Sequence, residues 1–169
     1  MPSRHSGAAC EAAKEGVPSV AFSGRSGSQV SFTTLTDTSA GSTIAAENYA
    51  ALSIEFTNAL LASSARPILP PNISLNVNFP ATSATQCPTP EDFTFVLTRV
   101  TTAAGGAPPD VSRCGTTRLP TEASVLGLSN ACFISVSVMD ATTKVDVPAA
   151  TQAVVLERLE SFLGCLPTS

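Results

Sequence analysis

The sequence predicts an α/β fold with helices flanking a mostly parallel sheet, and three observations support this prediction. Near the N-terminus, a helix of small residues is followed at once by a turn and a buried strand. Three later segments alternate apolar and polar residues, as strands with one apolar face do. Two longer segments repeat apolar residues every three or four positions, which is the period of a helix packed on a sheet.

The N-terminal unit spans residues 7–24. A helix over its first half would place its charged residues on one arc and its smallest residues on the other, namely Ala8, Ala9, Ala12 and Ala13. Because this arc has little bulk, we expect the helix to lie very close to a sheet. Gly16 can adopt the left-handed conformation that ends a helix, and Pro18 cannot continue it. The chain is therefore expected to turn and extend through residues 19–22.

A surface loop and a second helix are predicted next. Residues 24–42 are rich in Gly, Ser and Thr, with Val30 and Phe32 in a short extended piece. Ser42 or Thr43 is expected to cap the following helix. The buried face of that helix is predicted from its periodic residues, which are Tyr49, Leu52, Phe56, Ala59 and Leu60.

The second half of the chain predicts three strands, a long loop and a last helix. The apolar faces of the strands are Leu75, Val77 and Phe79, then Phe93, Phe95 and Leu97, then Cys132, Ile134, Val136 and Val138. Residues 101–121 contain Gly and Pro pairs and are predicted to form a loop, which at this length is usually functional or mobile. The last helix is predicted from Val155, Leu156, Leu159, Phe162 and Leu163 and ends before Gly164 and Pro167.

Length and composition limit the function classes. A chain of 169 residues predicts one domain over residues 1–169. Its net charge of −4 and the absence of a basic stripe disfavour a nucleic-acid polymer as partner. No apolar run approaches the roughly 20 residues that a membrane span needs, so no membrane partner is expected. Residues 1–6 have no apolar core and do not resemble a secretory signal.

Five cysteines leave the redox compartment open. Cys87 and Cys114 each lie in a loop flanked by Pro or Gly, so in a secreted protein we expect them to form a disulfide. In a reducing compartment they would be buried or free thiols. An odd number leaves one cysteine unpaired. The sequon at Asn72 is weak evidence for secretion.

Several motifs occur in the order found in one protein family. Residues 7–23 run through Gly-Ala-Ala, an acidic helix, a Gly-hydrophobic-Pro turn and a strand that ends in Ser. Residues 75–80 (Leu-Asn-Val-Asn-Phe-Pro), 98–99 (Thr-Arg), 122–125 and 132–138 follow in the same order. The sequence resembles the SurE survival-protein family of metal-dependent nucleotidases and acid phosphatases, especially the fungal SurE-like phosphatases. This resemblance implies a partial Rossmann-like three-layer α/β/α sandwich.

The resemblance also implies hydrolysis of phosphate monoesters, including nucleotides, with a divalent cation, Mg²⁺ or Mn²⁺. In the family the cation is held by an Asp-Asp pair with a Ser and an Asn, all of which would precede residue 1. No Asp-Asp pair occurs in these 169 residues, so we predict no catalytic residue and no metal ligand. The family's phosphate-contacting Ser-Gly-Thr-Val loop aligns with the divergent residues 3–6, where only Ser3 matches. Ser3 and Gly7 are therefore the predicted remnant of a phosphate site.

Other polar motifs are predicted to have structural roles. The acidic pair Glu91 and Asp92 follows two prolines and is expected to cap a turn. Asn76 and Asn78 are expected to tie neighbouring loops by hydrogen bonds. Residues 24–28 have the composition of an anion nest, but they lack the Gly-Lys-Ser or Gly-Lys-Thr of a P-loop and are interpreted as a flexible surface loop.

Three functional hypotheses follow. The first is a C-terminal fragment of a SurE-like phosphatase that is inactive alone. The second is a non-catalytic, SurE-derived interaction or dimerisation module, because uncovered apolar faces favour association and are compatible with a homo-oligomer. The third is a small secreted protein that its disulfides stabilise, with an unrelated role. The compartment of the parent protein stays open.

Overall fold

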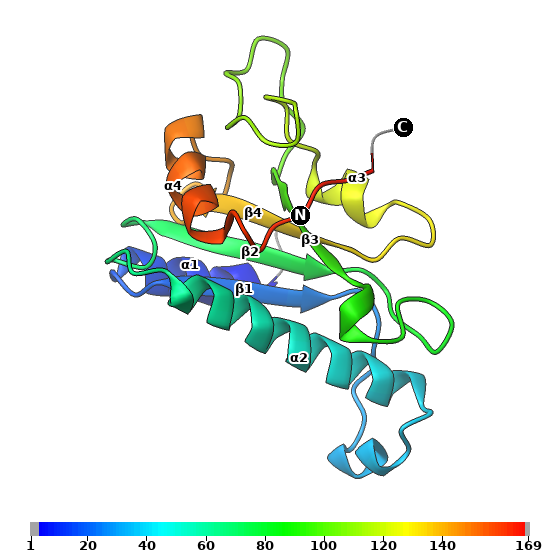
Figure 1. Ribbon diagram of the computed structural model, residues 1–169. Coiled ribbons are helices and arrows are strands. Elements are labelled where there is room, and N and C mark those ends of the chain that lie inside the picture. The colour runs from blue at the N-terminus through cyan, green and yellow to red at the C-terminus, as the bar shows by residue number, and fades with distance from the viewer. Residues whose placement is uncertain (1–3, 168–169) are drawn as a thin grey trace.

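The computed structural model describes residues 4–167, and its helices and strands alternate along the chain (Figure 1). The elements, with η for a 3₁₀ helix, are α1 (Arg4–Lys14), β1 (Ser19–Gly24), η1 (Phe32–Thr36), α2 (Gly41–Ala62), β2 (Ile73–Phe79), η2 (Pro90–Asp92), β3 (Thr94–Thr98), α3 (Glu122–Leu126), β4 (Phe133–Asp140) and α4 (Ala149–Leu159). The predicted α/β class is confirmed.

The four strands form one open sheet in the order β1-β2-β4-β3. β1 and β2 are parallel, β3 and β4 are parallel, and the central pair of β2 and β4 is antiparallel. The prediction of a mostly parallel sheet is therefore confirmed, with one antiparallel seam. The carboxyl ends of β1 and β2 lie at one end of the sheet, and those of β3 and β4 lie at the opposite end.

Helices cover both faces of the sheet, which gives three layers. The main core lies between the sheet and the pair α2 and α4, and it includes Leu52, Phe56, Leu75, Val77, Ile134, Val136, Val155 and Leu159. The other face lies beneath α1 and α3 and is polar along its centre, with Ser74, Asn76, Asn78, Ser135 and Ser137. These polar residues are buried. Because apolar and polar residues alternate along the strands, one face of the sheet packs in an apolar layer and the other in a polar layer.

The buried face of α1 differs from the predicted arc. Its buried residues are Ser6, Ala9, Cys10 and Ala13, whereas Ala8 is exposed. Cys10 and Ala13 pack against Met139 and Ala141 at the carboxyl end of β4. Apart from Glu11, every side chain in residues 6–13 is small, so bulk alone could not select the arc. The predicted turn is confirmed, because Gly16 adopts a φ of +80°.

The core face of α2 is confirmed. Leu52 and Phe56 are fully buried, and Tyr49 and Ala59 pack at the margin of the same core. Although α2 is the longest helix, no helix among residues 4–167 has the combined length and apolar character that crossing a bilayer requires.

The start of α2 differs from the prediction. The helix begins at Gly41, and the N-cap residue is Ala40, whose side chain makes no capping bond. Ser42 and Thr43 therefore lie inside the first turn. The Thr43 hydroxyl instead donates to the carbonyl oxygen of Thr34, at 3.1 Å, and fastens the preceding loop to the helix.

The loop before α2 contains a 3₁₀ helix where an extended piece was predicted. Phe32 begins η1, because the Ser31 hydroxyl accepts a hydrogen bond from the amide of Thr33 and caps the turn. Phe32 is 83% exposed, and the segment projects from the body of the molecule (Figure 1). Val30 lies outside any helix or strand.

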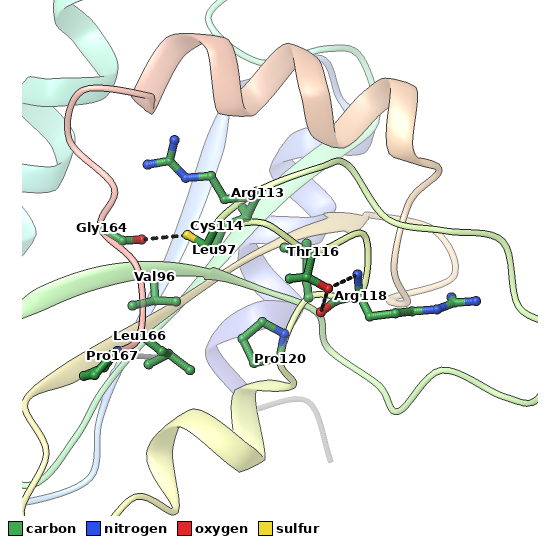
Figure 2. A pocket seen from close by; sticks show the side chains of 11 residues that line it. Val96, Leu97, Arg113, Cys114, Thr116, Arg118, Pro120, Gly164, Leu166 and Pro167 are labelled. Carbon is green, nitrogen blue, oxygen red and sulfur yellow. Dashed lines mark hydrogen bonds between the residues drawn. The ribbon is translucent and has the colours of Figure 1, made fainter. Parts of the chain in front are cut away.

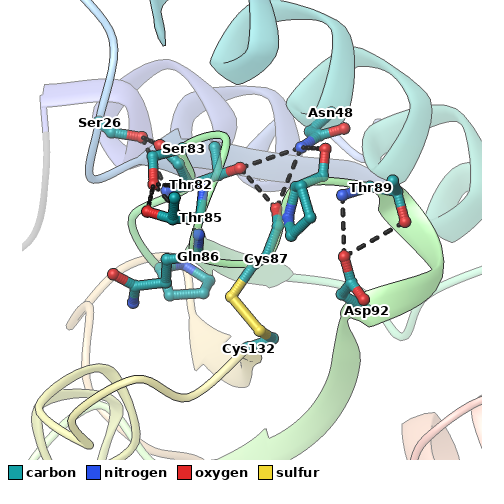
Figure 3. Close-up of a disulfide and its surroundings, with 12 residues drawn as sticks. Ser26, Asn48, Thr82, Ser83, Thr85, Gln86, Cys87, Thr89, Asp92 and Cys132 are labelled. Atoms are coloured by element: carbon teal, nitrogen blue, oxygen red, sulfur yellow. Dashed lines mark hydrogen bonds between the residues drawn. A yellow bond between two sulfur atoms is a disulfide. The ribbon is translucent and has the colours of Figure 1, made fainter.

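The predicted disulfide between Cys87 and Cys114 is wrong. Cys87 pairs with Cys132, with 5.7 Å between their Cα atoms (Figure 3), and Cys114 pairs with Cys165, with a Cα separation of 5.8 Å. The strand order explains the first pair, because Cys132 directly precedes β4, which lies next to β2. The fifth cysteine, Cys10, is a buried free thiol.

The predicted extent of the last helix is too long. α4 ends at Leu159, and Phe162 and Leu163 follow it in a turn. Both residues still pack on the core, Leu163 as a buried residue and Phe162 as a partly buried one. Their apolar character therefore reflects burial beyond the end of the helix.

Residues 101–121 are fastened to the body of the molecule by a buried ion pair. Within this described segment no residue lies in a helix or a named strand. The Arg99 guanidinium contacts Asp110 Oδ2 at 2.9 Å and Asp146 Oδ2 at 3.5 Å. Asp110 also accepts a hydrogen bond from Gln152 of α4. Asp110 thus links this segment to Arg99, which follows β3, and to Gln152 of α4.

Candidate functional site

A hydrogen-bonded cluster lies on the polar face of the sheet beneath α3. Asn76 Nδ2 donates to Glu122 Oε1 at 2.7 Å. Ser137 also hydrogen-bonds to the Glu122 carboxylate, and its hydroxyl lies 2.7 Å from that of Thr98. The Thr121 hydroxyl caps α3 by accepting from the amide of Ser124, which sets Glu122 in the first turn. Two strands, β2 and β4, therefore contact the carboxylate of α3, and β3 joins the cluster through Thr98 and Ser137.

The surroundings of Glu122 perturb its acidity. Burial raises the pKa of its carboxyl above the ordinary value, and the hydrogen bonds from Asn76 and Ser137 only partly oppose this effect. Asn76 Oδ1 is itself buried and accepts no hydrogen bond from a described residue. A perturbed carboxyl among buried hydroxyl and amide groups is a candidate for proton transfer or ligand contact.

Glu122 should make the stability of the protein depend on pH. Because its folded pKa lies above its unfolded value near 4.5, its stabilising contribution is complete below that value and is lost as pH rises through the folded pKa. We expect Glu122→Gln to flatten this fall in the free energy of unfolding between pH 4.5 and neutral pH, measured by urea titration. The exposed Glu55→Gln control should keep the wild-type slope, and an unchanged slope in Glu122→Gln would contradict the assignment.

A cleft of about 440 Å³ lies at the carboxyl ends of β1 and β2, beside the end of α3. Ser23 Oγ donates to Asn78 Oδ1 at 2.6 Å, and Asn78 Nδ2 donates to Ser135 Oγ at 3.3 Å. The exposed Arg25 guanidinium donates to the carbonyl oxygen of Leu126 across the cleft. Ligands of open α/β sheets bind outside the carboxyl ends of the strands. An anion could bind here if Arg25 exchanged that carbonyl for it.

Comparison with family models identifies the protein at the level of its family. The model described as survival protein SurE matches residues 3–104, which is more than half of the chain. The chain belongs to the SurE family. The matched part includes α1, β1, α2, β2 and β3 and thus Asn76 and Thr98 of the polar cluster, while Glu122 and Ser137 follow it. A search of curated proteins found no match.

The predicted phosphate remnant of this SurE-family chain is only partly described. Ser3 lies outside the described residues. Gly7 lies in α1, is partly exposed, and has open space where a Cβ would stand. Contact of Ser3 and Gly7 with phosphate therefore stays a prediction.

The residues present do not fit the divalent cation that SurE-family membership implies. Among residues 4–167 no group of three or more His, Cys, Asp or Glu side chains could hold a metal ion. Asp110 and Asp146 both contact Arg99. Asp92 caps η2, as predicted for the acidic pair, by accepting from the amide and hydroxyl of Thr89 (Figure 3). The described residues therefore provide no ligand set for a cation-dependent hydrolytic step.

Sequence reasoning missed Glu122 and Arg25 as candidate residues of this SurE-family protein. The composition of the loop that contains Arg25 predicts flexibility, but Ser26 in it bonds to the Tyr49 hydroxyl at 2.7 Å and thereby fixes the loop. Asn76 and Asn78 do form hydrogen bonds, but their partners are side chains of α3, β1 and β4 instead of neighbouring loops. Only the three-dimensional structure brings these partners together.

Proposed function

We propose that this chain is the C-terminal part of a SurE-type metal-dependent phosphatase or nucleotidase that acts on phosphate monoesters, and that it is inactive alone. Family membership supports the reaction class. The claim that the chain is inactive alone is supported by one observation, which is that the side chains of residues 4–167 do not fit the implied cation. Metal-dependent hydrolysis needs oxygen ligands that converge on the ion.

In this proposal the chain contributes binding groups at one end of the sheet. α1 runs antiparallel to β1, because the short turn of residues 15–18 joins them. The amino end of α1 therefore lies toward the carboxyl ends of β1 and β2, where the cleft is found. A phosphate monoester held there would be near the guanidinium of Arg25 and the hydroxyl of Ser23, and a cation would have to be held by other residues.

The test is phosphate release from a nucleoside monophosphate by the purified 169-residue protein. We expect no release above the protein-free blank, with or without Mg²⁺ or Mn²⁺, because residues 4–167 contain no carboxylate cluster for the ion. Metal-dependent turnover that a chelator abolishes would keep the phosphatase class and overturn the claim that the chain is inactive alone.

Binding of inorganic phosphate, measured by calorimetry, tests the cleft separately. Arg25→Ala should lose the binding that the wild-type protein shows. The matched control is Arg66→Ala, because Arg66 is also exposed but bonds only to the backbone near it, at Ser63 and Ala65. Equal binding by wild type and Arg25→Ala would remove the cleft from the proposal.

One observation favours a second candidate function, a non-catalytic interaction module. The outer edge of β3 is partly covered, because Gly164 forms a bridge with Val96 and Thr121 forms one with Arg99, the residue after β3. Among the described strands, β1 pairs only with β2, so its other edge is open. An open edge can accept a strand from another chain. Light scattering on the free protein distinguishes the candidates: a discrete oligomer supports the module, and a monomer or polydisperse aggregates contradict it.

A further inference from the structure

The two disulfides differ in their accessibility. Cys87 is 4% exposed, and its carbonyl oxygen accepts hydrogen bonds from Thr82 Oγ1 at 2.7 Å and Asn48 Nδ2 at 3.3 Å (Figure 3). Its partner Cys132 is partly buried, whereas Cys114 and Cys165 are both exposed. A thiolate must reach a sulfur atom to reduce a disulfide. The bond between Cys114 and Cys165 is therefore the one that a reductant reaches from solvent.

The exposed disulfide joins two segments that lie against the outer edge of β3. Cys114 belongs to the loop of residues 101–121, and Cys165 belongs to the tail after α4. The tail pairs with β3 through an isolated bridge between Gly164 and Val96, in which the Gly164 amide donates to the Phe95 carbonyl at 2.8 Å. The approach is close, because a Cβ on Gly164 would lie 2.5 Å from Thr94 Cγ2. The disulfide thus reinforces a sparse contact.

A pocket of about 420 Å³ lies between these two segments. Val96 and Leu97 contribute apolar surface from β3, and Leu166 and Pro167 contribute it from the tail (Figure 2). Leu119, at the end of the loop, also lines the pocket.

The two arginines at the pocket do not fill it. The Arg113 guanidinium donates to the carbonyl of Leu163, and that of Arg118 donates to Ala107 and Pro108 at 2.7 Å each. Both guanidinium groups point away from the centre of the pocket (Figure 2). The interior is therefore mainly apolar, and its two walls are the segments that the disulfide joins.

We propose that the disulfide between Cys114 and Cys165 is a redox-operated clasp that holds the two walls of this pocket together. A thiolate of a dithiol reductant attacks one of the two sulfurs, breaks the bond between them and forms a mixed disulfide. The second thiol of the reductant displaces the mixed disulfide, which leaves two cysteine thiols and a cyclic, oxidised reductant. The loop and the tail then separate and widen the apolar pocket, while the bond between Cys87 and Cys132 keeps the sheet intact.

The experiment titrates the folded protein with dithiothreitol, blocks the thiols by alkylation and locates them by peptide mass spectrometry. We expect alkylation of Cys114 and Cys165 at a dithiothreitol concentration roughly tenfold below that needed for Cys87 and Cys132. Hydrogen exchange should then rise in residues 113–120 and 163–167 and stay unchanged in β2 and β4. Simultaneous reduction of both disulfides, or unchanged exchange in the two walls, would overturn the proposal.

Two double variants separate the clasp from general stability. Cys114→Ser with Cys165→Ser should show the exchange pattern of the reduced protein without any reductant. If that variant fails to fold, the disulfide supports the whole fold and the clasp is disproved. Cys87→Ser with Cys132→Ser should keep the tail protected until dithiothreitol is added. Neither readout depends on phosphate hydrolysis, so the result is independent of the proposed function.

Discussion

Replacing Phe56 with alanine is expected to lower the free energy of unfolding by about 3–5 kcal/mol. Phe56 is fully buried at the centre of an aromatic cluster on the core face of α2. Its ring centroid lies 5.9 Å from that of Phe22, 5.5 Å from that of Phe95 and 6.0 Å from that of Phe162. The lost stability has two parts: the transfer free energy of a large apolar side chain, and the cost of the cavity that it leaves. The cavity persists because the three elements around it cannot all move to fill it.

Urea unfolding followed by circular dichroism measures this change, since the chain has no Trp. Phe32→Ala is the matched control, because Phe32 is 83% exposed on η1 and its loss should change the stability by less than about 0.5 kcal/mol. Equal effects of the two substitutions would show that α2 is not packed on the sheet as described.

Asp110→Asn should destabilise the protein to a similar degree, by roughly 3–5 kcal/mol. Asp110 Oδ2 accepts from Arg99 at 2.9 Å and from the amide of Leu119 at 3.1 Å, while Oδ1 accepts from Gln152 at 2.9 Å. The side chains of Arg99 and Asp110 are only 10% and 5% exposed. Asparagine would turn an NH₂ group toward one of these donors and leave the arginine charge partly unpaired.

Glu55→Gln is the control for this loss of charge, because Glu55 is exposed on α2, and it should change the stability by less than about 0.5 kcal/mol. Hydrogen exchange provides a second readout: residues 101–121 should lose protection first in Asp110→Asn, since Asp110 anchors them. An Asp110→Asn protein as stable as wild type would show that the ion pair does not hold this segment.

Elements that depend on strong local signals could be predicted from the sequence. The spacing of Leu52 and Phe56 identified the core face of α2, and Gly16 with Pro18 identified the turn before β1. The arc of α1 could not be selected, because Ala8 and Ala9 are equally small and only contact with Met139 and Ala141 distinguishes the buried side. The local sequence pattern thus predicts that a helix or strand forms better than it predicts which side of that element is buried.

The candidate site depends on contacts that span the chain. Asn76, Thr98, Glu122 and Ser137 form one cluster although they lie on four different elements. No spacing rule joins them, because the strand order β1-β2-β4-β3 brings them together. The same order explains the wrong disulfide, since Cys87 meets the residue before β4 instead of another loop cysteine.

The antiparallel seam between β2 and β4 gives the molecule two unlike poles. At one pole β1 and β2 finish, and an open cleft follows their last residues. At the other pole β3 finishes against Arg99, whose charge is neutralised internally by Asp110 and Asp146. The carboxylates of Asp110 and Asp146 thus already pair with the cation at the second pole. Because β3 and β4 run opposite to β1 and β2, the open cleft and the internal ion pair lie at opposite ends of the sheet.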